Sequence, residues 1–294
     1  MPQPAEIAAE VECVWPLGAE LGEGPVWVAS ESAVYFVDIK APAIHRLEPE
    51  SGQRTTWPAP AQVGFLVPVT GGGFVCGLQG GLYRFDPRDG GFTRLCAVEA
   101  DRPGNRINDG FVDPAGRLWF GTMDDAEAAV AGTLYRWSGG DAPDAIDAGY
   151  TITNGPAVSP DGRTLYHTDS AAKTVYAFDL TAEGALSGKR VFAQTTDAHP
   201  DGMAVDAEGC LWVTLFGGWR IERYSPDGAV IGAVRFPCAN ITKLAFGGPD
   251  LRTAYATTAK LHLSAEARAA QPLAGGLFRF PVDTPGLPQA VFDL

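Results

Sequence analysis

The sequence predicts an all-β fold, a six-bladed β-propeller with four-stranded blades. One strand with an aromatic residue recurs six times, at Tyr35, Phe74, Trp119, Tyr166, Trp212 and Tyr255. These aromatic positions lie 39, 45, 47, 46 and 43 residues apart, close to the period of a propeller blade. Glycine-rich turns and flanking strands repeat with the same spacing, which predicts one domain closed into a ring.

Each repeat contains the same succession of strands and tight turns. The turn before the aromatic strand is Asp113-Pro114-Ala115-Gly116 in one repeat and Ser159-Pro160-Asp161-Gly162 in the next, with proline and glycine where a tight turn needs them. A third strand alternates apolar and polar residues, as at 132–137, the period of a half-buried strand. An outer strand follows, as at 190–193. The best helix candidate is a short alanine-rich segment over 264–270.

The repeats place the six blades at roughly residues 18–60, 61–104, 105–150, 151–197, 198–239 and 240–294 of a single domain. A terminal segment has to supply the outer strand of the last blade if the ring is to close. Residues 11–16 look strand-like and precede the first repeat. Residues 288–293 compete for the same role, so two ways of closing the ring remain open.

The composition limits the classes of partner. The chain has 294 residues, of which 19% are charged, and a formal net charge of −13. No basic stripe is present to bind nucleic acid or an anionic membrane surface, so we expect neither partner. Five widely spaced cysteines without a C-x-x-C pair are typical of free thiols in a reducing compartment. We expect a cytoplasmic protein that is a monomer or a weak oligomer.

Four short motifs recur about 11 or 12 residues before an aromatic strand residue. They are Glu23-Gly24-Pro25, Asn108-Asp109-Gly110, Asn154-Gly155-Pro156 and Asp201-Gly202-Met203. The first strand of each propeller blade lines the central channel, so the first side chains of these motifs should face one another. Val63-Gly64 and Thr242-Lys243 occupy this phase in the other two blades. Two carboxylates and two amides form an all-oxygen set that suits a hard divalent cation.

A simpler alternative is that these aspartates and asparagines are turn residues. Four motifs in one phase, including a glutamate that turn chemistry does not require, favour a site. Arg106 lies two residues before Asn108, so on a strand it would face the same side. There it could donate hydrogen bonds to a substrate oxygen. The alternative is a surface arginine that pairs with Asp101 or Asp109.

Four further polar residues are assigned simpler roles. By the same two-residue spacing, His199 precedes Asp201, and we expect it at the rim of the channel. His167 lies on a repeated strand and is expected in the core or next to the site. Asp38 and Asp169 end their strands at matching positions, which indicates a structural role in the blade.

Together these motifs resemble the gluconolactonase/regucalcin (senescence marker protein) family. The resemblance rests on residues 21–27, 105–110, 121–123, 153–156, 200–203 and 246–248 and spans essentially the whole chain. Residues 36–40, 166–169 and 272–276 are similar to bacterial sugar-acid lactonases of pentose oxidation, including xylonolactonases and arabinonolactonases. The resemblance implies metal ligation by Glu23, Asn154 and Asp201. It also implies contacts of Arg106 and Asn108 with a sugar lactone.

The chain departs from the family in one place. The family often has a glutamate that contacts substrate shortly after the Gly-Thr-Met segment, whereas here Met123 is followed by Asp124-Asp125-Ala126-Glu127. We expect Asp125 to contact the substrate, with Asp124 and Glu127 as the alternatives.

The sequence therefore predicts a metal-dependent lactonase that opens an aldono-lactone to the sugar acid. A pentonolactone such as xylono- or arabinonolactone is favoured, and gluconolactone is a further candidate. The ion would act as a Lewis acid on the lactone carbonyl, and Asp201 would be the general base. Fe²⁺, Ca²⁺, Zn²⁺, Mn²⁺ and Mg²⁺ all accept such ligands. The alternatives are a calcium-binding regulatory protein without hydrolase activity and a propeller arylesterase or phosphotriesterase.

Overall fold

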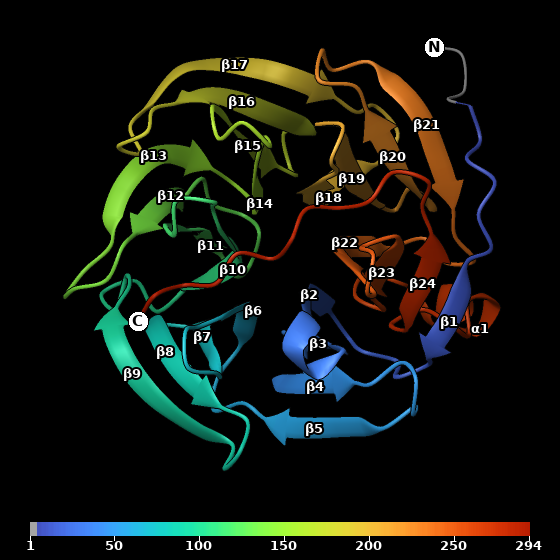
Figure 1. Ribbon diagram of the computed structural model, residues 1–294, viewed down its shortest axis with the longest axis horizontal. Helices are drawn as coiled ribbons and strands as arrows, with labels where there is room; N and C mark the ends of the chain where they lie inside the picture. Colours follow the sequence, from blue (N-terminus) through green and yellow to red (C-terminus); the bar gives the residue numbers. More distant parts are fainter. Residues whose placement is uncertain (1–4) are drawn as a thin grey trace.

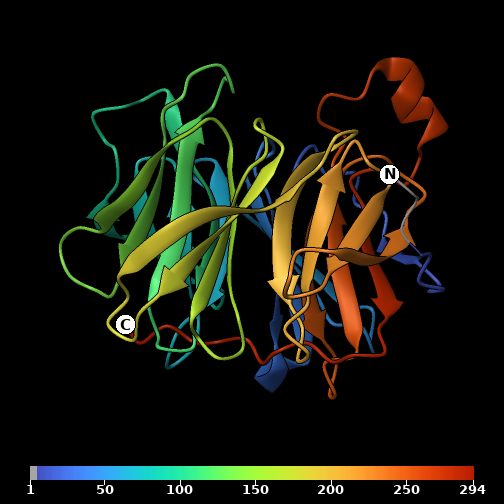
Figure 2. The same cartoon turned by 90° about the horizontal axis from the view of Figure 1, so that it is seen from above.

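The computed structural model, which describes residues 5–294, is a ring of six four-stranded antiparallel sheets around a central axis (Figure 1). It confirms the predicted six-bladed propeller. Figure 2 shows the blades from the side, with α1 (Ala265–Ala270) projecting at one face and the C-terminal segment crossing the other. The helix confirms the one expected over 264–270, and the Ser264 side chain caps it by accepting a hydrogen bond from the backbone N–H of Ala267.

In the first five blades the strands follow chain order from the channel outwards. The strands of blades one to three are β2 (Gly22–Val28), β3 (Ala33–Asp38), β4 (Ala43–Leu47), β5 (Arg54–Pro58), β6 (Val63–Pro68), β7 (Phe74–Leu78), β8 (Gly81–Asp86), β9 (Gly91–Ala97), β10 (Asn105–Val112), β11 (Leu118–Asp124), β12 (Gly132–Trp137) and β13 (Asp144–Tyr150). A short 3₁₀ helix, η1 (Ala29–Glu31), connects β2 to β3.

Blades four and five repeat this order, and blade six is completed by a strand from the N-terminal segment. The strands are β14 (Thr153–Val158), β15 (Thr164–Asp169), β16 (Thr174–Leu180), β17 (Leu186–Gln194), β18 (His199–Val205), β19 (Leu211–Phe216), β20 (Arg220–Tyr224), β21 (Val230–Arg235), β22 (Ile241–Gly247), β23 (Thr253–Thr258), β24 (Leu277–Pro281) and β1 (Glu12–Trp15). Among residues 5–294, none of the helices could span a membrane.

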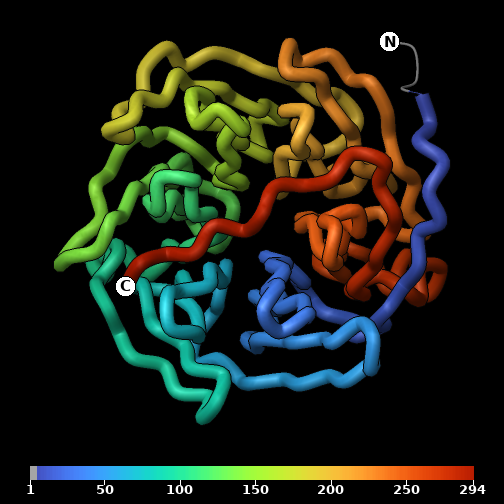
Figure 3. Tube along the Cα trace, in the orientation of Figure 1, coloured from blue at the N-terminus to red at the C-terminus, as the bar shows by residue number. Residues whose placement is uncertain are grey.

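Of the two terminal segments, the N-terminal one completes the last blade. β1 pairs antiparallel with β24, and Glu12 lies opposite Arg279. The C-terminal segment instead crosses one face of the ring as a strap (Figure 3). At its end Phe292 forms a bridge to Val69 and stacks on Trp137 with ring centroids 5.0 Å apart. The strap therefore ties the last blade to blades two and three.

Asp38 and Asp169 have the structural role that the sequence predicts. The Asp38 carboxylate accepts hydrogen bonds from the backbone N–H groups of Glu20 and Leu21, which lead into β2. Asp169 accepts the corresponding bonds from Thr151 and Ile152, at the entry to β14. Because β2 and β14 begin directly after these loops, each aspartate fixes where an inner strand enters the channel.

His167 belongs to the core. It is fully buried in β15, and neither ring nitrogen has a hydrogen-bond partner among the described residues. Its ring packs edge-on against Tyr150, with centroids 4.7 Å apart. Burial lowers the pKa of His167 to about 3, so the folded protein holds a neutral imidazole here.

Acid should therefore destabilise the protein through His167. Between its unfolded pKa and its lowered folded pKa, the unfolded chain binds a proton that the folded chain does not. Stability should fall as the pH drops below about 6.5, by about 1.4 kcal/mol per pH unit from this residue. His167→Phe should remove that part of the slope, as measured by urea unfolding at several pH values. Identical slopes in the two proteins would contradict this expectation.

Candidate active site in the central channel

A cavity of about 360 Å³ lies in the channel, and the residues that the repeat singled out line it. Its walls include Glu23 of β2, Asn108 of β10, Asn154 of β14 and Asp201 of β18. Arg106 of β10 lines the same cavity. The innermost strands of four blades thus present polar side chains to one space.

A local irregularity of the inner strands turns these side chains into the channel. The pairing of every inner strand with its neighbour shifts register at this level, between Glu23 and Val26 in β2 and between Asn154 and Ala157 in β14. Such shifts are typical of β-bulges, which bend a strand and redirect a side chain. Gly155 has a φ of 75°, a conformation that favours glycine. The recurring polar–glycine motif is therefore the sequence signature of the bulge.

Glu23, Asn154 and Asp201 are all buried, and hydrogen bonds hold the first two in place. Oε2 of Glu23 accepts a bond from the backbone N–H of Gly24 at 2.8 Å. Nδ2 of Asn154 donates to Oγ of Ser170 at 2.8 Å, and Ser170 in turn donates to the carbonyl of Pro200 at 2.6 Å. With its amide nitrogen thus engaged, Asn154 keeps its oxygen on the channel side, where it accepts a bond from Asn108 at 2.9 Å.

The electrostatics of these groups favour a bound cation. Burial, followed by the nearby carboxylate of Asp109, raises the pKa of Glu23 to about 8. Burial also raises the pKa of Asp201 well above its usual range, with Glu23 as the next cause. Desolvated carboxylates that oppose each other's ionisation are stabilised as anions by a divalent ion placed between them.

The donor set fits a hard divalent ion with open coordination positions. Within residues 5–294 no group of three His, Cys, Asp or Glu side chains is arranged to hold a metal. The third donor here is the amide oxygen of Asn154, which together with carboxylates suits ions that prefer oxygen. Three such donors would leave positions for water and substrate on a bound ion.

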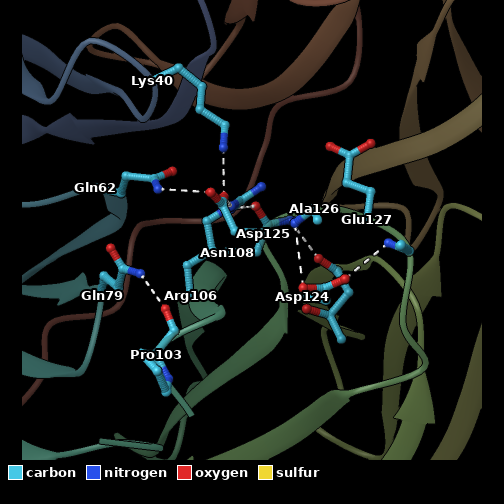
Figure 4. A network of polar contacts seen from close by, with 12 residues as sticks. Lys40, Gln62, Gln79, Pro103, Arg106, Asn108, Asp124, Asp125, Ala126 and Glu127 are labelled. Carbon is cyan, nitrogen blue, oxygen red and sulfur yellow. Dashed lines mark hydrogen bonds and ion pairs between the residues drawn. The ribbon is translucent and has the colours of Figure 1, made fainter.

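Arg106 is held at the cavity by a network of polar contacts (Figure 4). Its Nε donates to Oδ1 of Asp125 at 2.7 Å, and its guanidinium also donates to Oδ1 of Asn108. Asp125 additionally accepts bonds from Lys40 at 2.5 Å and Gln62 at 3.1 Å. The alternative partners for Arg106, Asp101 and Asp109, are thus replaced by Asp125.

The three acids after Met123 occupy different places. Asp124 accepts bonds from the backbone N–H groups of Ala128 and Ala129 and so shapes its own loop. Asp125 lies against Arg106, as described above. Of the three acids, only Glu127 is among the residues that line the cavity. Contact between Asp125 and the substrate stays a prediction.

Several wall residues carried no signal in the sequence. Ser170, Asn240 and His262 lie in loops outside the repeated motifs. His262 Nε2 is 3.3 Å from Oε2 of Glu127, which joins loops of blades six and three. His199 lines the cavity, and its Nδ1 is 2.9 Å from the carbonyl oxygen of Ser170. No local sequence pattern marks these residues, so only the folded structure brings them to the cavity wall.

Comparison with known proteins places the chain among relatives of similar length. The family described as SMP-30/Gluconolactonase/LRE-like region matches residues 21–260. The chain is 35% identical to 6-deoxy-6-sulfogluconolactonase of Pseudomonas putida, over 96% of this chain and 98% of that protein. It is 34% identical to pentonolactonase XacC of Haloferax volcanii, over 93% and 95%. A crystal structure described as a calcium-binding protein, regucalcin, from Agrobacterium tumefaciens superposes with a TM-score of 0.94 at 28% identity, over 100% of both chains.

Proposed function

The chain belongs to the SMP-30/gluconolactonase/LRE-like family, and we propose that it hydrolyses sugar lactones in the channel with the aid of a divalent metal ion. It is an enzyme of the lactonase class, in keeping with the names of its relatives. The observation that carries the proposed mechanism is that Glu23, Asn154 and Asp201 share one cavity with Arg106 and Asn108.

Glu23, Asn154 and Asp201 would hold the ion through their side-chain oxygens. The bound ion would supply Lewis acidity toward the lactone carbonyl. Fe²⁺, Ca²⁺, Zn²⁺, Mn²⁺ and Mg²⁺ are all compatible with two carboxylates and an amide.

The side chains account for the remaining chemistry. Asp201 takes a proton from the water whose oxygen bonds to the carbonyl carbon. The bond from that carbon to the ring oxygen then breaks, and the ring oxygen leaves as a hydroxyl by taking the proton that Asp201 had accepted, which returns Asp201 to its carboxylate form. The product is the open sugar acid.

Arg106 holds an oxygen of the sugar, because its guanidinium keeps N–H donors beyond those used on Asp125 and Asn108. The Asn108 amide donates to Thr153 and Asn154 before substrate binds, so its contact with the sugar requires exchange of one of these bonds.

We favour a pentonolactone as substrate, with gluconolactone as a further candidate. The support for the former is the relative named pentonolactonase XacC, and for the latter the relative named 6-deoxy-6-sulfogluconolactonase. The cavity of about 360 Å³ lies near the lower end of the range for small-molecule sites, which suits a single sugar ring.

Acid release from a panel of lactones tests this choice. Metal-free protein would be supplied separately with Ca²⁺, Mg²⁺, Mn²⁺, Zn²⁺ or anaerobic Fe²⁺, and xylono-, arabinono-, galactono- and gluconolactone would be compared after subtraction of spontaneous opening. We expect the highest kcat/KM with a pentonolactone. Faster turnover of aryl or organophosphate esters would favour the arylesterase or phosphotriesterase alternative instead.

A calcium-binding regulatory protein remains the second candidate. It is favoured by the likeness to the Agrobacterium protein, which is described as calcium-binding. Tight Ca²⁺ binding without hydrolysis of any lactone in the panel would support it over the lactonase.

Substitution of Arg106 should weaken substrate binding and turnover together. Arg106→Met keeps an unbranched apolar stem but removes the charged donors, so we expect kcat/KM to fall by about 100-fold. Arg102→Met is a matched control, because Arg102 is more than half exposed and lies 3.6 Å from Glu99. Steady-state kinetics would measure both variants. An Arg106→Met enzyme with the kinetics of the control would exclude a substrate-binding role.

A further inference from the structure

We propose that Lys243 is a fixed counter-cation of the channel, which sets the charge of the metal site so that it accepts a single divalent ion. The inference rests on the metal site proposed above. Lys243 lies on β22 of blade six, at the level where four other blades present their polar residues. Neither the repeat nor the proposed mechanism gives it a role.

The lysine crosses the channel and is almost fully buried there. Its ammonium forms an ion pair with Asp109 of β10, a residue of blade three, and lies 3.3 Å from the carbonyl oxygen of Gly110. Lys243 is 8% exposed and Asp109 is 1% exposed. The pair therefore joins opposite parts of the ring through the protein interior.

Glycine at position 202 makes room for this side chain. A Cβ atom at Gly202 would come within 2.6 Å of Cβ and Cγ of Lys243, closer than such atoms approach in proteins. The Asp201-Gly202 motif thus combines a proposed ligand with the space that the lysine needs. This packing puts the stem of the lysine against Gly202, one residue from Asp201, although Lys243 lines the neighbouring cavity of the channel rather than the one that holds Asp201.

The charges of the channel balance around one divalent ion. Glu23, Asp109 and Asp201 are all buried, and each lies at the register shift of its inner strand. Lys243 supplies one positive charge. Arg106 and Lys40, in contrast, both pair with Asp125 and together offset the charges of Asp125 and of the wall residue Glu127. Three carboxylates and one ammonium leave two negative charges, which one divalent cation neutralises.

The negative charge of Asp109 still acts on the site although Asp109 is paired with Lys243. Its Oδ2 is buried and has no hydrogen-bond partner among the described residues. The ion pair therefore satisfies only one side of the carboxylate. If Lys243 only connected two blades, its removal would change the stability of the fold alone. If it is a counter-cation, its removal must also change the affinity of the site for metal.

The two roles are separated by charge changes of opposite sign. Lys243→Met keeps the stem and removes the positive charge, so we expect metal to bind about tenfold more tightly or better. Asp109→Asn removes a negative charge and should weaken binding by about tenfold or more. The double variant removes both and should return to within about threefold of the unmodified protein. Lys189→Met is the matched control, because it breaks a lysine–aspartate pair between the outer strands β17 and β13.

Isothermal titration of the metal-free proteins with Mn²⁺ and, separately, Ca²⁺ would give affinity and stoichiometry, with thermal unfolding as a check of folding. The Asp109→Asn variant leaves the Lys243 ammonium buried without its partner and could fail to fold for that reason. In that case Lys243→Met is compared with the double variant, since the two differ only in the charge at position 109. Equal affinities in all folded variants would overturn the inference and leave the proposed function intact. Failure of the unmodified protein to bind any divalent ion would overturn both.

Discussion

Asp201→Asn is expected to abolish lactone hydrolysis, with kcat reduced by about 1,000-fold or more. Asparagine has the size of aspartate and keeps one oxygen for the metal, but it cannot take a proton from water. Burial raises the pKa of the Asp201 carboxyl in the metal-free protein, so the ion would have to favour the carboxylate form that accepts the proton. Titrated acid release with xylonolactone, under saturating metal, would measure the loss.

A control within the same blade separates the chemistry from general damage. Asp227 lies exposed in a turn of blade five, so Asp227→Asn changes the same charge far from the cavity and should retain full activity. Bound metal must be quantified in Asp201→Asn, because loss of the ion would also stop the reaction. Near-normal turnover by a metal-loaded Asp201→Asn enzyme would exclude Asp201 as the base.

Removal of metal should have a comparably large effect. Enzyme stripped with a chelator is expected to release acid no faster than the spontaneous reaction, because the carbonyl then lacks its Lewis acid. Addition of one suitable divalent ion should restore turnover. The ion should also stabilise the fold, by about 2.7 kcal/mol at a concentration of 100 times its Kd, since the buried carboxylates of Glu23 and Asp201 lose their mutual repulsion.

The measurement combines activity, metal content and thermal unfolding on the same samples. Chelator already saturated with metal serves as the control for effects of the chelator itself. A preparation shown to be free of metal that still hydrolyses the lactone at the original rate would contradict the metal-dependent mechanism. Restored stability without restored turnover would instead favour the binding-protein alternative.

The sequence determined the architecture because a propeller is built from one structural unit that recurs along the chain. Each blade requires the same turns and the same aromatic strand, so the spacing of Trp119, Tyr166 and Trp212 was sufficient to predict the number of blades. The same periodicity put Glu23, Asn154 and Asp201 at one level of the ring, where the structure brings them to one cavity. The sequence alone could predict this convergence because the bulge that turns these side chains into the channel is encoded by a short local motif.

Only the tertiary structure decided the contacts that do not follow the repeat. Asp125 meets Lys40 across 85 residues of chain, and Lys243 meets Asp109 across 134. The choice of Glu127 over Asp125 as the wall residue, and of β1 over the C-terminal strap as the closing strand, likewise depends on how loops and termini settle against distant blades. The repeat determines where each inner strand enters the channel. The direction of a long charged side chain such as Lys243 or Lys40 depends instead on the oppositely charged residue of a distant blade with which it pairs.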